Sequence, residues 1–226
     1  MCRACARAPT VVLTVDQLRE RARKTVGLGG PDGPPVPAAE VLPHLDSGDR
    51  NVRVAALRVL AFSDEPAAAD GILRGLDDPV KRVREVAAKS SIRFLGDQRV
   101  IDRLRRAVED DETGSCRPAL EILGGVYHAP YGLMAVEPVA EAMAALAAIP
   151  AHRQQVLASL LRARALTDDV AAVLRDFVRD GSKEEAVAAT RRLCGLRIER
   201  RELIDEDILR TAEPARGHLW YWIRAD

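Results

Sequence analysis

A pattern that recurs along the chain constrains its fold more than any other feature. Three similar dipeptides open successive apolar segments, at offsets of 31 and 33 residues: Val52-Arg53, Val83-Arg84 and Cys116-Arg117. Small and aliphatic residues follow each dipeptide at helical spacing, and the lead-ins LDSGDRNVR and LDDPVKRVR are alike. An internal period of this length indicates stacked supersecondary units, because one unit alone cannot bury its apolar face. We therefore expect neighbouring repeats to build one continuous core.

Helical periodicity dominates the sequence from residue 38 onward, in short segments broken by Asp, Gly and Pro. Aromatic residues are only 4% of the chain, so the core depends on Ala, Leu, Val and Ile, which favours closely packed helices. We predict an all-α, right-handed α-solenoid of about five to six helical hairpins over residues 38–226, with almost no sheet. The expected pairs are Ala38–Asp46 with Asn51–Phe62, Ala67–Leu76 with Val80–Leu95, Arg99–Glu109 with Ser115–Val126, Val136–Ala148 with Ala151–Ala165, Asp168–Arg179 with Lys183–Leu196, and Leu203–Ala212 with Pro214–Ile223.

The first 35 residues do not show the repeat. Residues 1–13 are expected to be a loose basic leader, and a helix over 14–26 begins with Thr14 and Gln17 at capping-box spacing. Residues 27–37 hold four prolines and four glycines, so we expect a linker that separates this helix from the rest of the chain. Cys2-x-x-Cys5 is a weak metal signal, since a structural zinc site needs four ligands.

Charge and motifs exclude several classes of function. The 34 basic residues balance 34 acidic ones, which argues against a generic nucleic-acid binder. We find no phosphate-binding glycine loop, nucleophile motif or metal-ligand cluster, and so expect no catalytic residue, cofactor or metal. No apolar stretch is long enough for a membrane span or a signal sequence, and the four cysteines fit reduced thiols. The chain is therefore expected to be cytoplasmic.

The segment LDDPVKRVREVAAKSSIRFLGD, residues 76–97, resembles a short bacterial HEAT-type repeat. That family has an Asp-x-x-x-x-Val-Arg-x-x-Ala core that ends in Leu-Gly-Asp. The resemblance is clear over residues 36–125 and weaker over 136–196, where the helical pairing persists without the Val-Arg signature. The matching residues here are Asp78, Val83, Arg84, Ala87, Leu95, Gly96 and Asp97.

The resemblance implies a binding scaffold, because enzymes are a minority in this family. The leading hypothesis is a non-enzymatic scaffold or adaptor that binds another protein through a concave face lined by the second helices of the hairpins. The alternative is a DNA-binding protein, or a DNA glycosylase that acts on alkylated bases through a basic, tryptophan-lined groove. Here the tryptophans lie near the C-terminal end and the basic excess is missing. Chromophore lyases and their relatives also carry such repeats and rank third, because no residue indicates a bilin site.

Eight residues are candidates for partner contact. First helices lie on the convex side in this family, so exposed second-helix residues should face the groove. Residues 124–136 break the repeat and form either a recognition loop or a connector, and the aromatic cluster near the C-terminal end either caps the last hairpin or docks a partner. The candidates are Arg58, Lys89 and Arg93 on second helices, Tyr127, His128 and Tyr131 in the irregular segment, and Trp220 and Trp222 near the C-terminal end.

The repeat arginines have a different expected role. A basic ladder that binds phosphate is one interpretation of their spacing. Structural pairing is favoured, because every lead-in supplies a carboxylate. We therefore expect each arginine to pair with an acidic residue in its own or the next repeat's turn, such as Asp49, Asp78 or Asp111, and we expect Arg53 and Arg84 to be stability residues.

Overall fold

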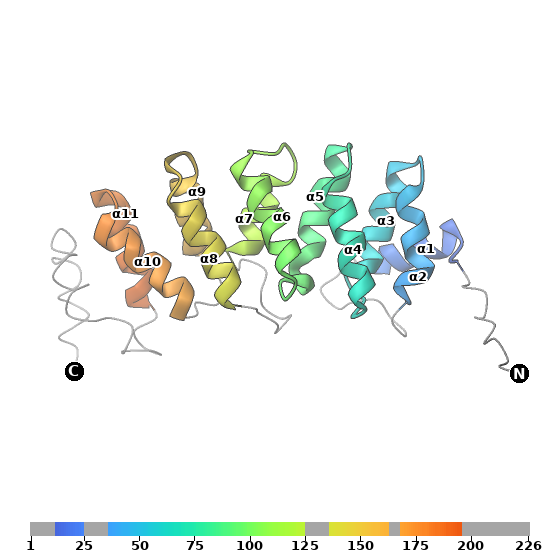
Figure 1. The fold of residues 1–226 in the computed structure, drawn as a ribbon, viewed down its shortest axis with the longest axis horizontal. Coiled ribbons are helices and arrows are strands. Elements are labelled where there is room, and N and C mark those ends of the chain that lie inside the picture. The colour runs from blue at the N-terminus through green and yellow to red at the C-terminus, as the bar shows by residue number, and fades with distance from the viewer. Residues whose placement is uncertain (1–11, 25–35, 125–135, 163–167, 196–226) are drawn as a thin grey trace, which may run out of the picture. The chain divides into compact units, whose positions relative to one another are not determined.

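The computed structural model describes residues 12–24, 36–124, 136–162 and 168–195. Every regular element within these ranges is a helix, and none of them contains a strand. The chain divides into two compact units, Met1–Phe94 and Leu95–Asp226. In each unit the helices form antiparallel pairs that stack side by side (Figure 1). The all-α solenoid class expected from the repeat is confirmed.

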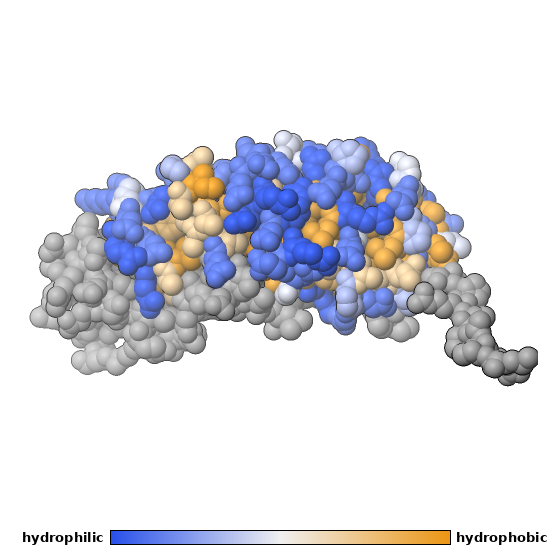
Figure 2. Space-filling view, viewed as in Figure 1, coloured by the Kyte–Doolittle hydropathy of each residue, from blue (hydrophilic) through white to orange (hydrophobic). Residues whose placement is uncertain are grey.

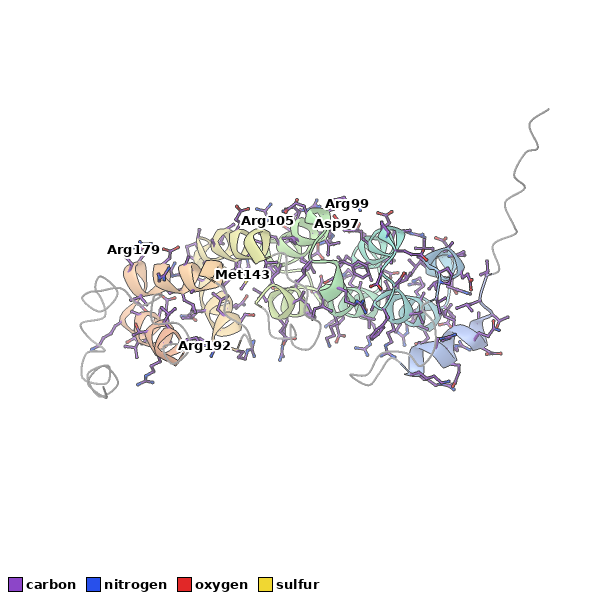
Figure 3. All side chains as sticks on the ribbon, turned by 90° about the horizontal axis from the view of Figure 1, so that it is seen from below. Asp97, Arg99, Arg105, Met143, Arg179 and Arg192 are labelled. Carbon is purple, nitrogen blue, oxygen red and sulfur yellow. The ribbon has the colours of Figure 1, made fainter. Side chains whose placement is uncertain are left out.

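The first unit contains a separate helix and two hairpins. Below, the first helix of a hairpin is called an A helix and the second a B helix. A helices pack on A helices and B helices on B helices, which gives two layers within the unit (Figure 3). The elements are α1 Val15–Lys24, α2 Ala38–Val41 with the 3₁₀ helix η1 Leu42–Asp46 (A), α3 Arg50–Leu60 (B), α4 Pro66–Leu76 (A), and α5 Lys81–Ser90 with the 3₁₀ helix η2 Ser91–Phe94 (B).

Individual residues determine where these helices begin and where α-helix changes to 3₁₀ helix. Asp49 caps α3, because its carboxylate accepts a hydrogen bond from the backbone N–H of Asn51 at 2.8 Å. The expected single helix 38–46 turns into 3₁₀ geometry at Leu42, next to Pro43, which has no N–H to donate. The expected helix 80–95 likewise ends as α-helix at Ser90, and the Ser91 hydroxyl donates to the Ala88 carbonyl at 2.7 Å.

Two glycines one turn apart let α4 approach its neighbours closely. A Cβ added at Gly71 would lie 2.7 Å from Cδ1 of Leu60, and one added at Gly75 would lie 2.5 Å from Cδ2 of Leu57. The Gly75 position would also place its Cβ 2.9 Å from the Cβ of Ala87 on α5. The A and B layers therefore meet at a distance that larger residues do not permit.

The N-terminal helix is separated from the hairpins along the chain but not in space. Helix α1 packs against α3, with Leu18 and Ala22 buried. Figure 3 shows it on the side of the B helices that faces away from the A helices. The predicted capping box is confirmed, since the N–H of Thr14 donates to Gln17 and the N–H of Gln17 donates back. An ion pair of 3.1 Å joins Arg19 to Asp49.

The second unit continues the pairing of A and B helices. Helix α6 packs against α7, α8 against α9, and α10 against α11, while α8 lies between α6 and α10. In the turn after α6, Asp111 and Gly114 have positive φ angles of 47° and 100°. The elements are α6 Gln98–Glu109 (A), α7 Cys116–Leu123 (B), α8 Val136–Ala147 (A), α9 Pro150–Arg162 (B), α10 Asp168–Asp180 (A) and α11 Lys183–Gly195 (B).

Buried polar contacts hold the second unit together as well. Arg103 donates to Glu112 at 3.0 Å, and the buried Ser115 donates to the same carboxylate at 2.9 Å. On α9, the buried Ser159 hydroxyl donates to the carbonyl of Leu120 on α7 at 2.6 Å.

Figure 2 shows hydrophilic residues over α6 and more hydrophobic ones over α8, whose exposed residues include Ala144. The expected pair 203–212 and 214–223 lies outside the described residues.

Candidate functional site

Arg53 ties the first hairpin to the second. Its Nε and Nη2 donate to the two carboxylate oxygens of Asp78 at 2.7 and 3.0 Å, and its Nη1 donates to the carbonyl of Ser47 at 2.7 Å. The side chains of Arg53 and Asp78 are only 11% and 9% exposed. Hydrogen bonding to Asp78 raises the pKa of Arg53 above its ordinary value, so the guanidinium stays charged. The expected pairing of this arginine with a turn carboxylate is confirmed.

Arg84 makes the corresponding backbone contacts one repeat later. Its Nη1 donates to the carbonyls of Asp78 and Pro79 at 2.8 and 3.0 Å, six and five residues before it. Arg53 contacts Ser47 and Gly48 at the same two offsets. Asp78 therefore receives Arg53 on its carboxylate and Arg84 on its carbonyl, and both arginines hold the turn in front of their own helix.

Arg117 departs from this pattern, and the expectation for it was wrong. Its side chain is 82% exposed and pairs with Glu121 one turn further along α7, at 3.1 Å, rather than with a carboxylate of the preceding turn. The reason is helical register. Arg53 and Arg84 are the fourth residues of their helices, whereas Arg117 is the second residue of α7. The fourth residue of α7 is the buried Ala119.

Arg153 occupies the same helical position as Arg53 and Arg84, although the repeated dipeptide did not predict it. Arg153 is the fourth residue of α9, and its Nη1 donates to the carbonyl of Ala147, six residues before it, at 3.3 Å. Its Nε lies 3.4 Å from Glu185, and its guanidinium lies 4.4 Å from the ring centre of Phe177. Glu185 also accepts the N–H of Ser182 at 2.8 Å at the start of α11. Proline is a favoured first residue of a helix, so the sequence alone could have placed the start of this helix at Pro150 and Arg153 at its fourth position.

The helices of the first unit carry their charges unevenly. The B elements α3, α5 and η2 hold eight basic residues and one acidic residue, whereas the A elements α2, η1 and α4 hold one basic residue and three acidic ones. The neutral total of the whole chain hides this separation. Burial divides each B helix further. On α3, Val52, Leu57 and Leu60 are buried, whereas Arg50 and Asn51 remain exposed. We call the residues of α3 and α5 that point away from the core, and that α1 does not cover, the outward B face.

Three expected contact residues lie in this part of the chain. Lys89 is exposed and pairs with Glu85 at 2.8 Å, Arg93 is half-buried and pairs with Asp64, and Arg58 is half-buried without an ion pair to any described residue. Glu85 also accepts from Arg82 at 2.8 Å. Hydrogen bonds from Lys89 and Arg82 lower the pKa of Glu85 below its ordinary value. The other five candidates, Tyr127, His128, Tyr131, Trp220 and Trp222, lie outside the described residues.

The described residues form no arrangement that is typical of catalysis. Among them, no group of three or more His, Cys, Asp or Glu side chains is placed to hold a metal ion. Burial raises the pKa of the Cys116 thiol to about 11, so this cysteine is a weak nucleophile at neutral pH. Within the described ranges, no helix has the length and apolar character that crossing a bilayer requires. Cys2 and Cys5 lie outside these ranges.

Comparison with known proteins agrees with the repeated helical hairpins. A family model of HEAT repeats matches residues 38–124. The chain matches no curated protein and no solved structure. The matched range begins at the first residue of α2 and ends one residue after α7. The hairpins from α2 to α7 therefore belong to the HEAT-repeat family.

Proposed function

We propose that this protein is a non-enzymatic scaffold or adaptor that binds another protein through the outward B face of its first unit. HEAT repeats are commonly protein-interaction scaffolds. The partner lies in the cytoplasm under this proposal.

One observation carries this choice of surface. Helices α3 and α5 pack against each other, and their buried residues and Arg53 hold the two hairpins together. The positions of α3 and α5 that neither the core nor α1 covers make no contribution to that packing, yet they carry exposed residues such as Asn51 and Lys89 on a framework that is already ordered. A surface held rigid before binding loses little conformational entropy when a partner docks.

The sequence suggests further residues that could contact the partner. Aromatic residues with polar groups are enriched at binding hot spots. We therefore retain Tyr127, His128, Tyr131, Trp220 and Trp222 as candidates, to be tested together with Arg58, Lys89 and Arg93.

Site-specific photo-crosslinking tests the choice of surface. A photoreactive amino acid is placed at Asn51 or Lys89 on the outward B face, or at the exposed Ala39 of the A helix α2 as the matched control. The variants are expressed in the native cell and irradiated. We expect one discrete protein adduct from positions 51 and 89, and none from position 39. Adducts formed only at position 39, or none at either B-face position, would contradict the proposal.

DNA binding, including glycosylase action on alkylated bases, is the alternative function. The observation in its favour is the excess of eight basic residues over one acidic residue on the B elements of the first unit. A gel-shift titration with duplex DNA at increasing salt distinguishes the two functions, because each phosphate contact adds to the salt slope. A steep slope, with excision of an alkylated base, would establish the alternative. We expect weak binding and no excision.

A further inference from the structure

We propose that the outward B face recognises a short acidic segment of the partner protein, and that Arg50, Arg58 and Lys81 bind its carboxylates. This inference rests on the scaffold function proposed above and adds the chemistry of the partner. We call these three residues the cation strip.

The members of the cation strip are the basic side chains of this face that the fold leaves uncommitted. Arg50, Arg58 and Lys81 make no ion pair or side-chain hydrogen bond with any residue that the structure describes. Arg50 and Lys81 are exposed, and Arg58 is half-buried. The neighbouring cations already have partners: Arg82 and Lys89 share Glu85, and Arg93 pairs with Asp64.

Two of the three residues stand where helix stability disfavours a positive charge. Arg50 and Lys81 are the first residues of α3 and α5, and neither helix has an acidic residue in its first turn. The N-terminal end of a helix carries a partial positive charge, so a cation there is unfavourable and a carboxylate is favourable. Helix α11 also begins with a lysine, Lys183, but its first turn contains two glutamates. Asp49 supplies a carboxylate at the start of α3, but it already pairs with Arg19, and no side-chain cap begins α5. An incoming carboxylate would therefore be favoured most strongly beside Lys81.

The dimensions of the strip fit a short peptide. Helix α5, against which α1 does not pack, has 10 residues and is about 15 Å long. Packed helices lie roughly 8–10 Å apart. An extended peptide advances about 3.3 Å per residue, so about five residues follow one helix from end to end. Because α3 and α5 pack directly, acidic residues spaced along such a segment reach cations on both helices.

Two features favour carboxylates over nucleic acid as the ligand. The described residues of α3 and α5 include no aromatic side chain on which a base could stack. Glu85 lies among the cations and would repel a continuous row of phosphates, whereas individual carboxylates in a peptide can avoid it.

A fluorescence anisotropy titration tests the inference with defined probes. The probes are a labelled eight-residue peptide rich in Asp and Glu, its Asn and Gln counterpart, and a labelled DNA oligonucleotide of similar length. The full chain is compared with the double variant Arg50→Glu/Lys81→Glu. The matched control is Lys183→Glu/Arg191→Glu, which makes the same charge change on α11, where both residues are exposed. Each protein is measured at about 50 mM and about 200 mM salt.

We expect the acidic peptide to bind the wild-type chain and the control equally, and to bind Arg50→Glu/Lys81→Glu at least about tenfold more weakly. The uncharged peptide should not bind. The melting temperature of this double variant should stay equal or rise, because glutamate suits a helix N-terminus. No binding of the acidic peptide, equal loss in the control, or tighter binding of the DNA would each overturn the inference. Photo-crosslinks at positions 51 and 89 would then still support a scaffold with a partner of different chemistry.

Discussion

Asp78 organises the junction between two repeats through two different groups. Its carboxylate receives the guanidinium of Arg53, and its carbonyl receives that of Arg84. The same carboxylate accepts the N–H of Val80 at 2.8 Å in the turn before α5. A charged pair this well buried is costly to form, but once it is formed, removal of one partner leaves the other charge uncompensated.

Replacement of Arg53 by Ala should therefore destabilise the first unit by about 3–5 kcal/mol. Urea denaturation followed by circular dichroism measures the change. Arg23→Ala is the control, since both members of the Arg23–Glu20 ion pair are exposed and the pair should contribute less than about 1 kcal/mol. Similar losses for the two variants would show that Arg53 is not a structural tie.

The charge of Glu85 should matter for binding more than for folding. Glu85→Gln releases Arg82 and Lys89 and removes the one acidic residue from the B elements of the first unit. Anisotropy titration of the acidic peptide should then show an affinity about two- to fivefold higher than wild type, because repulsion falls and two cations become available. An unchanged or lower affinity would indicate that the peptide does not approach α5.

At the scale of elements, periodicity located most of the described helices to within one or two residues. The failures have local causes. Helix boundaries near Pro43 and Ser91 depend on which backbone N–H groups can continue the α pattern. Arg117 was assigned by its Val-Arg-like dipeptide, although its place in α7 differs by two residues from that of Arg53. Arg153 occupies the right place without the dipeptide.

Close packing of α4 gives a test at this scale. Gly75→Ala should destabilise the first unit by about 1–3 kcal/mol, because its Cβ would meet Leu57 and the Cβ of Ala87. Thermal denaturation measures the effect. Gly48→Ala is the control, since an added Cβ there has no neighbour within 4 Å. Equal melting temperatures for the two variants would mean that the layers can separate without cost.

At the scale of the whole molecule, the overall composition does not reveal the uneven distribution of charge that matters most for the proposed binding. A formal net charge of zero argues against a basic surface, yet the B elements of the first unit carry a strong basic excess. The excess becomes visible only when residues are sorted by element and by burial. Sequence spacing correctly identified the repeats and the structural role of Arg53, but it gave no reason to separate Arg50 and Lys81 from the other arginines and lysines.

Hydrogen–deuterium exchange of the full chain, with and without its crosslink-identified partner, shows directly whether the outward B face is the binding surface. We expect slower exchange in α3 and α5 on binding, and little change in α4. Arg53→Ala should raise exchange throughout the first unit without the partner, and Arg50→Glu/Lys81→Glu should abolish the protection that the partner gives. Protection confined to A helices, or to the segment that contains Trp220 and Trp222, would contradict the assignment of the outward B face as the binding surface.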